Sequence, residues 1–252
     1  MSNRVRDLWA AGQAAKACWL QIPGLLHAES LARVGFDALV IDLQHSPIEP
    51  ADAFAMMPSI ELGGAEPFVR LHRNEPFDAM KMADMGASGI IAPLVNTAED
   101  VQRLVQGLDY APNGKRSYGP RRPLLRYGAG YAASARKTLV IMAMIETREA
   151  LTNLPEILDS DGLDGVFIGP TDLAIELGCK PSVDSDETPV VEAIANILVQ
   201  AKARGKHAGI FCGSGAFARR MIADGFDFVS VAPDLSLLVA AAKRELVETN
   251  RP

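Results

Sequence analysis

Short apolar runs alternate with longer amphipathic stretches along the whole chain of 252 residues. Eight runs have the length and composition of buried strands, and the stretches between them carry apolar residues at helical spacing. Such alternation predicts parallel strands joined by right-handed crossovers. The predicted strands are Ala17–Gln21, Asp37–Asp42, Pro67–Arg70, Gly89–Ala92, Leu139–Ile145, Gly165–Ile168, His207–Phe211 and Phe228–Val231. The predicted helices include His27–Val34, Pro76–Met85, Ala98–Leu108, Val190–Arg204, Ala216–Asp224 and Leu235–Val247.

The number of strands decides between the two common parallel architectures. Eight strands, rather than five or six, favour a closed barrel over an open sheet, and the length is that of a typical eight-fold βα barrel. No tract rich in proline, serine or glycine separates one part of the chain from another. The sequence therefore predicts an α/β fold, a single (β/α)8 TIM barrel, with residues 1–252 forming one domain.

Composition narrows the class of protein. With 48% hydrophobic and 22% charged residues, the chain can bury a large core. A net charge of −6 gives no support to nucleic-acid or membrane-surface binding. No apolar run approaches the roughly 20 residues of a membrane-spanning helix, and the N-terminus lacks the apolar core of a signal peptide. Three widely spaced cysteines suit reduced thiols, so a cytoplasmic protein is expected.

The stretch Gly165–Leu173 is the most informative in the chain. An apolar run enters Gly169-Pro170, and Asp172 follows two residues later, which predicts a buried strand that passes directly into a helix. A second acid, Glu146, ends the preceding strand. Each acid alone could be an ordinary residue at a helix start. Together, at adjacent strand ends, they favour a site for Mg²⁺ or Mn²⁺, which prefer oxygen ligands.

Other strand ends carry further polar groups. Trp19 lies near the end of the first strand, Asp42 ends the second and is followed by His45, and Arg70 ends the third. His45 could be a core histidine, but Asp42 three residues earlier could orient its ring. Arg70 needs an anionic partner, either an acid of the barrel or a substrate oxyanion. Because active sites of such barrels lie at the C-terminal strand ends, this convergence predicts an enzyme.

The segment Lys115–Lys137 interrupts the alternation and carries seven basic residues and no acidic one. In a barrel, an irregular excursion of this kind is usually a loop over the active-site face or a subunit contact. Ion pairing between subunits is the simplest role for its charges. A non-catalytic protein that uses this segment to bind RNA or another anion remains an alternative from a different class.

Motifs in order along nearly the whole chain resemble the HpcH/HpaI class II aldolases of the phosphoenolpyruvate/pyruvate superfamily. They are Phe36–Asp42 with His45, Phe68–Arg70, Gly86–Pro93, Ile145–Ala150 and Asp164–Leu173. The resemblance implies a (β/α)8 barrel assembled as a homo-oligomer, usually a hexamer built as a trimer of dimers. It also implies that the C-terminal helix packs on a neighbouring subunit. The runs Asp42–Pro47, Gly119–Arg122 and Gly209–Gly215 look most like the hydroxyketoacid aldolases, which accept hydroxypyruvate as well as pyruvate.

The resemblance also suggests catalytic roles. Glu146 and Asp172 match the metal ligands, with Co²⁺ a third candidate ion beside Mg²⁺ and Mn²⁺. Arg70 matches the group that binds the 2-oxo acid and its enolate oxygen. His45 and Asp42 match the proton-transfer pair.

A second set of residues is implied to surround the substrate. The backbone of Gly169, Pro170, Thr171 and Asp172 would hold the substrate carboxylate, and Trp19 would line the aldehyde side. Asp84 matches an acid that reaches the metal site of a neighbouring subunit. Gln44 and Met144 depart from the glutamate and glutamine common in the family, which affects substrate preference more than reaction type.

The expected reaction is addition of a pyruvate or hydroxypyruvate enolate to an aldehyde, giving 4-hydroxy-2-oxo acids, and the reverse cleavage. A citrate-lyase-like acyl-CoA lyase of the same superfamily is the alternative enzyme. A Schiff-base aldolase would need a lysine inside the barrel, whereas Lys16, Lys137 and Lys206 precede strands and so lie at the wrong end. No organic cofactor is expected.

Overall fold

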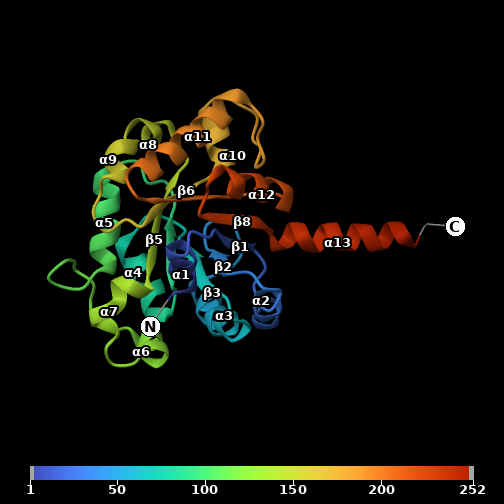
Figure 1. Cartoon of the computed structure of the whole chain (residues 1–252). Helices are drawn as coiled ribbons and strands as arrows, with labels where there is room; N and C mark the ends of the chain where they lie inside the picture. Colours follow the sequence, from blue (N-terminus) through green and yellow to red (C-terminus); the bar gives the residue numbers. More distant parts are fainter. Residues whose placement is uncertain (1–2, 250–252) are drawn as a thin grey trace.

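The computed structural model describes residues 3–249, which form a closed barrel of eight parallel strands (Figure 1). Each strand pairs with the next along the chain, and β8 pairs with β1 to close the barrel. The strands are β1 Ala15–Leu20, β2 Ala38–Asp42, β3 Glu66–Arg70, β4 Gly89–Ala92, β5 Val140–Ile145, β6 Gly165–Ile168, β7 His207–Ile210 and β8 Phe228–Pro233. The predicted TIM barrel is confirmed.

Helices alternate with the strands along the chain, and most of them cover the outside of the barrel (Figure 1). They are α1 Arg4–Ala10, α2 Leu25–Ala32, α3 Pro50–Gly63, α4 Pro76–Met85, α5 Ala98–Leu108, α6 Arg121–Tyr127, α7 Tyr131–Thr138, α8 Arg148–Thr152, α9 Leu154–Leu158, α10 Pro170–Glu176, α11 Thr188–Ala203, α12 Gly215–Asp224 and α13 Asp234–Glu248. The longest helix that the sequence analysis did not name is α3, whose pattern is interrupted by an internal proline, Pro58.

Alternate residues of each strand point into the barrel, where they form a second apolar cluster distinct from the one beneath the helices. Phe68, Phe167 and Phe228 fill its centre. Gly89 makes room for this packing, because a Cβ there would lie 2.3 Å from the Phe68 ring. The same period of two continues to the C-terminal strand ends, so the inward positions there belong to the candidate site.

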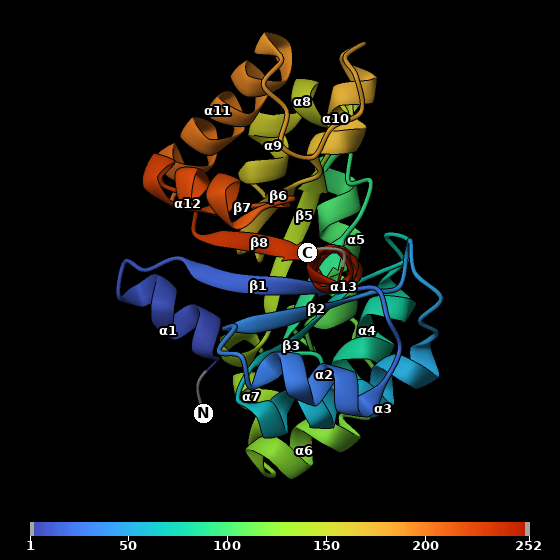
Figure 2. The same ribbon diagram turned by 90° about the vertical axis from the view of Figure 1, so that its right-hand side faces the viewer.

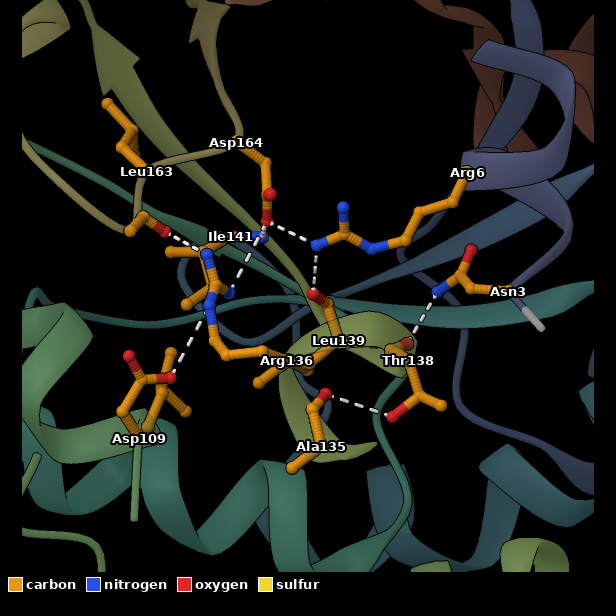
Figure 3. A network of polar contacts seen from close by, with 12 residues as sticks. Asn3, Arg6, Asp109, Ala135, Arg136, Thr138, Leu139, Ile141, Leu163 and Asp164 are labelled. Atoms are coloured by element: carbon orange, nitrogen blue, oxygen red, sulfur yellow. Dashed lines mark hydrogen bonds and ion pairs between the residues drawn. The ribbon is translucent and has the colours of Figure 1, made fainter. Parts of the chain in front are cut away.

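Helix α1 closes the N-terminal end of the barrel through a polar network (Figure 3). Asn3 donates two hydrogen bonds, to the carbonyl oxygens of Ser88 and Thr138. Arg6 donates to Asp164 at 2.7 Å, and the same Asp164 oxygen accepts the backbone N–H of Ile141 at 2.8 Å. These bonds join α1 to the starts of three strands, so this end serves stability, as expected for the N-terminal face of a barrel.

The basic segment Lys115–Lys137 lies at this N-terminal end rather than over the active-site face, and it contains the helices α6 and α7. The expectation of an irregular loop at the active-site face is therefore wrong for this chain's own barrel. Four of its arginines form ion pairs with acids of the same chain. The pairs are Arg116 with Asp84, Arg122 with Glu61, Arg126 with Glu61 and Glu66, and Arg136 with Asp109 and Asp164.

The C-terminal helix α13 leaves the barrel and projects away from it (Figure 1), and Figure 2 looks along its axis from the C-terminal end. Only its first residue, Asp234, is buried, whereas Leu238 and Leu246 are 56% and 66% exposed. Asp234 fixes the base of the helix, because its carboxylate accepts the backbone N–H groups of Gln21 and Ile22. None of the helices between residues 3 and 249 is both long enough and apolar enough to cross a membrane.

Candidate active site

A cavity of about 280 Å³ opens at the C-terminal ends of the strands. It gathers side chains and backbone from five strand ends and from the turn after β6. Its lining residues are Trp19, Gln21, His45, Arg70, Met144, Gly169, Pro170, Thr171, Asp172 and Phe211. The residues expected around the substrate and the candidate proton-transfer residue His45 thus share one cavity.

Arg70 and Asp42 form a buried ion pair beside this cavity. The two residues are direct partners in the β2–β3 register, which places their inward side chains next to each other. Arg70 Nε lies 2.8 Å from Asp42 Oδ1, and Nη2 lies 2.5 Å from Oδ2. The Asp42 side chain is fully buried and that of Arg70 is 9% exposed. Arg70 is thus fixed by two charge-assisted hydrogen bonds with one face over the Trp19 ring, 5.1 Å from its centroid.

The Asp42 carboxylate also shapes the loop that carries His45. Its Oδ1 accepts the backbone N–H groups of Gln44 at 3.0 Å and His45 at 3.3 Å. Burial raises the pKa of Asp42, but the bonds and charge of Arg70 and these two N–H groups outweigh burial and hold the pKa below its usual value. Within residues 3–249, Asp42 bonds the backbone of His45 and not its ring, so the expected orientation of the imidazole by Asp42 is not seen. His45 is exposed at the cavity wall.

Glu146 and Asp172 come together from adjacent strand ends. Glu146 follows β5 and is only 2% exposed, while Asp172 is exposed in the first turn of α10. Glu146 Oε1 accepts the backbone N–H of Leu94 at 2.8 Å. Burial raises the pKa of Glu146 and the negative charge of Asp172 adds to this effect, whereas the Leu94 N–H and the charge of Arg70 oppose it. The two carboxylates are therefore close enough to repel each other.

Gly169 makes this arrangement possible at the turn between β6 and α10. The strand ends at Ile168 and the helix begins at Pro170, as the sequence predicts. A Cβ on Gly169 would lie 2.6 Å from Glu146 Oε2 and 3.2 Å from Met144 Cε. The turn can therefore pass over the Glu146 carboxylate only because residue 169 has no side chain.

Aromatic and apolar side chains form the other walls of the cavity. Trp19 is fully buried and packs against Phe167 and Phe211, with ring centroids 5.3 and 5.1 Å away. Met144 is 2% exposed. Phe211 and Gln21 were not predicted as site residues. Both directly end or follow a strand, so the strand-end argument that found Arg70 could have included them.

Four expected residues do not line the cavity. Asp42 lies next to it through its bonds to Arg70, and Glu146 through its approach to Gly169. The other two are Gln44 and Asp84. Gln44 is half-buried, and its Oε1 has no hydrogen-bond partner among the described residues. Asp84 lies near the C-terminus of α4, at the opposite end of the barrel from this chain's own site. There the fully buried Arg116 side chain holds Asp84 Oδ1 at 2.6 Å. The structure therefore separates Asp84 from the site of its own subunit.

The carboxylates of Glu146 and Asp172 suit a divalent cation. No group of three or more histidine, cysteine or acidic side chains with metal-binding geometry occurs among the described residues. Two carboxylates with the remaining positions open to water or substrate oxygen are typical of Mg²⁺ and Mn²⁺ sites. Burial raises the pKa of Glu146 most and the charge of Asp172 adds to it, and a dication would oppose both effects. The residues present therefore fit such an ion.

Comparisons with known proteins agree with this geometry. A hydroxypyruvate/pyruvate aldolase of Rhizorhabdus wittichii is 59% identical to this chain and covers 98% of both proteins. A 4-hydroxy-2-oxo-heptane-1,7-dioate aldolase of Salmonella heidelberg is 35% identical, covering 96% of this chain and 93% of the relative. The crystal structure of a family member from Burkholderia cenocepacia superposes with a TM-score of 0.90 at 26% identity, over 99% of this chain and all of the other. The family described as HpcH/HpaI aldolase/citrate lyase matches residues 17–241. This chain therefore belongs to the HpcH/HpaI aldolase/citrate lyase family.

Proposed function

We propose that this aldolase makes and cleaves 4-hydroxy-2-oxo acids with the help of a divalent cation held by Glu146 and Asp172. The observation that carries the proposal is the pairing of these two carboxylates, one of them buried, beside a cavity that Arg70 and His45 also line. The relatives named for hydroxypyruvate/pyruvate and for 4-hydroxy-2-oxo-heptane-1,7-dioate support the same substrate class.

The donor substrate is a short 2-oxo acid such as pyruvate or hydroxypyruvate. When bound, the dication supplies a Lewis acid that stabilises negative charge next to the oxo carbon. Arg70 lines the same cavity as Asp172, and its pairing with Asp42 fixes it before the reaction begins. A positive group held in place in this way stabilises the enolate oxygen without reorganising during the reaction. The N–H groups around Gly169 to Asp172 receive the substrate carboxylate.

His45 is the proton-transfer residue of the proposal. Its imidazole lies on an exposed loop at the cavity wall, so it can move a proton on the aldehyde side and exchange it with solvent. Asp42 supports His45 through the backbone of that loop rather than through the ring. Trp19 and Phe211 form an apolar wall next to which the aldehyde lies.

The basic segment gives less support to the alternative enzyme, a citrate-lyase-like acyl-CoA lyase. An acyl-CoA ester carries phosphates that need free cations near the cavity entrance. Arg116, Arg122, Arg126 and Arg136 instead lie at the other end of this barrel and are engaged by carboxylates. Because these arginines are already paired with carboxylates, fewer free positive charges remain for the alternative role of binding RNA.

The direct test measures pyruvate release from 4-hydroxy-2-oxo acids, coupled to NADH oxidation by lactate dehydrogenase. Treatment with EDTA should abolish turnover, and adding back Mg²⁺, Mn²⁺ or Co²⁺ should restore it and rank the three ions. Glu146→Gln and Asp172→Asn should lose metal-dependent turnover, whereas the exposed Asp161→Asn should match the parent. Full activity after metal removal, or in Glu146→Gln, would contradict the proposal.

We further propose that the protein is a homo-oligomer, a hexamer, in which α13 packs on a neighbouring subunit. The support is the helix itself, which projects from the barrel (Figure 1) and has Leu235, Leu238 and Leu246 exposed. An amphipathic helix without an apolar surface to cover would be unfavourable in water. The double variant Leu238→Glu/Leu246→Glu should lower the native mass measured by light scattering. An unchanged mass would exclude α13 from the interface.

A further inference from the structure

The loop between β4 and α5 contains the only residue other than glycine with a positive φ in the part of the chain that the structure describes. Leu94 has a φ of 51°, and its side chain is 52% exposed. In every residue except glycine the side chain disfavours this left-handed backbone conformation. The conformation therefore persists only where the surroundings fix it. Such outliers occur most often at functional sites, and this one lies next to Glu146.

The contacts of Leu94 explain why the conformation is kept. Its backbone N–H donates to Glu146 Oε1 at 2.8 Å. The next residue, Val95, is fully buried in the core beneath the helices, so the chain must turn sharply between the two. The positive φ at Leu94 lets the same few residues contact the carboxylate and then enter the core.

Asn96 holds the other side of the same strand end. Its Oδ1 accepts a hydrogen bond of 2.6 Å from the hydroxyl of Thr147, the residue directly after Glu146. Asn96 is itself fixed, because its carbonyl accepts from Asn153 Nδ2 at 2.9 Å and its N–H donates to Asp100 at 3.0 Å. Leu94 and Asn96 therefore bracket Glu146, one through its carboxylate and the other through its neighbour in the chain.

The two oxygens of Glu146 consequently face different partners. Oε1 is engaged by the Leu94 N–H, while Oε2 faces Gly169 at the turn that leads to Asp172. We propose that residues 94–96 are a positioning element that holds Glu146 Oε1, so that Oε2 alone is presented to the cation shared with Asp172. This inference rests on the proposed metal role of Glu146, and it adds residues that never touch the ion.

The test measures the Kd for Mn²⁺, by the loss of the EPR signal of free Mn²⁺ on binding, in four variants. Leu94→Gly keeps the N–H and adopts a positive φ without strain, so it should bind Mn²⁺ like the parent. Leu94→Val is β-branched and least compatible with this φ, so its Kd should rise about five- to tenfold. Asn96→Ala should raise the Kd as well, whereas Asn196→Ala, an exposed residue on α11, is the matched control and should not.

Measurements of kcat and of the melting temperature distinguish a loss of positioning from general damage to the fold. If only the position of Glu146 is lost, saturating Mn²⁺ should restore kcat in Leu94→Val and Asn96→Ala, and their melting temperatures without metal should stay close to that of the parent. Should Leu94→Val fail to fold, Asn96→Ala decides alone. Folded variants that bind Mn²⁺ within twofold of the parent would overturn the inference, and so would a Leu94→Gly protein as weak as Leu94→Val. Unchanged Mn²⁺ binding in Glu146→Gln would instead overturn the proposed metal site.

Discussion

Replacing Asp42 by asparagine tests which residue this carboxylate serves. The structure gives Asp42 two bonds to Arg70 and only backbone contacts with His45, so we expect Asp42→Asn to act through Arg70. The asparagine keeps the shape and can accept one bond from Arg70. Its amide nitrogen, however, is a donor and cannot replace Oδ2, which accepts the hydrogen bond of Arg70 Nη2 at 2.5 Å.

The size of the effect follows from burial. The Asp42 side chain is fully buried and the Arg70 side chain is 9% exposed, so water cannot replace the lost bond. Hydrogen bonds to charged groups are worth about 1.5–3 kcal/mol, and breaking a buried pair costs about 3–5 kcal/mol. With one bond retained, we expect a loss of about 2–4 kcal/mol in transition-state stabilisation, or roughly 30- to 1,000-fold in kcat/KM.

A double-mutant cycle distinguishes the two partners in the pyruvate-release assay. If Asp42 acts through Arg70, Asp42→Asn adds little to Arg70→Lys, while its effect multiplies with that of His45→Ala. The matched control is Asp37→Asn, which breaks the pairing of Asp37 with Arg4 at the opposite end of β2 and should leave kcat/KM unchanged. The reasoning is refuted if Asp42→Asn has no further effect in the His45→Ala background but a full effect in the Arg70→Lys background.

Three further predictions follow from the structure. Gly169→Ala places a Cβ 2.6 Å from Glu146 Oε2 and should weaken Mn²⁺ binding about tenfold or more at a nearly unchanged melting temperature, so unchanged binding would contradict it. Asp164→Ala leaves Arg6 and the Ile141 N–H without their partner and should cost about 2–3 kcal/mol, lowering Tm by about 4–10 °C while kcat stays constant. The exposed Asp161→Ala is its control and should leave Tm unchanged. Burial and the charge of Asp172 raise the pKa of Glu146, so protons should displace Mn²⁺ at a pH above the ordinary glutamate pKa of about 4.3. An Mn²⁺ affinity that does not change as the pH falls toward this value would refute the prediction.

The fold was predictable because buried parallel strands leave a simple pattern in the sequence. Strands covered on both faces read as continuous apolar runs, and the runs ending at Asp42, Arg70 and Glu146 gave the strand ends correctly or within one residue. Since these ends meet on one face, Trp19, His45, Arg70 and Asp172 could be named without knowing any contact, whereas Gln21 and Phe211 of the same cavity were missed.

Partners across the barrel could not be predicted in the same way. Whether Asp42 pairs with Arg70 or with the His45 ring depends on the β2–β3 register, which no local pattern fixes. The role of Leu94 was also hidden, since a positive φ is usually marked by glycine and a backbone N–H leaves no trace in the sequence. The position of the basic segment Lys115–Lys137 could not be predicted for a related reason. Its charge pattern does not reveal that acids on α3 and α4 neutralise it.

The charges at the barrel mouth explain why a dication, rather than a second arginine, suits this site. Asp42 already neutralises Arg70, so Arg70 is fixed in place but does not pair with Glu146. Within residues 3–249, Glu146 and Asp172 have no basic side chain bonded to them, and the negative charge of Asp172 acts on Glu146. A 2-oxo acid is itself an anion and would be repelled by this pair alone. A doubly charged ion held as proposed would cancel both carboxylates and keep positions free for substrate oxygens, whereas a guanidinium would cancel only one and has no such positions. On the proposed function, the same acids that repel the substrate when bare would therefore recruit it once a dication is bound.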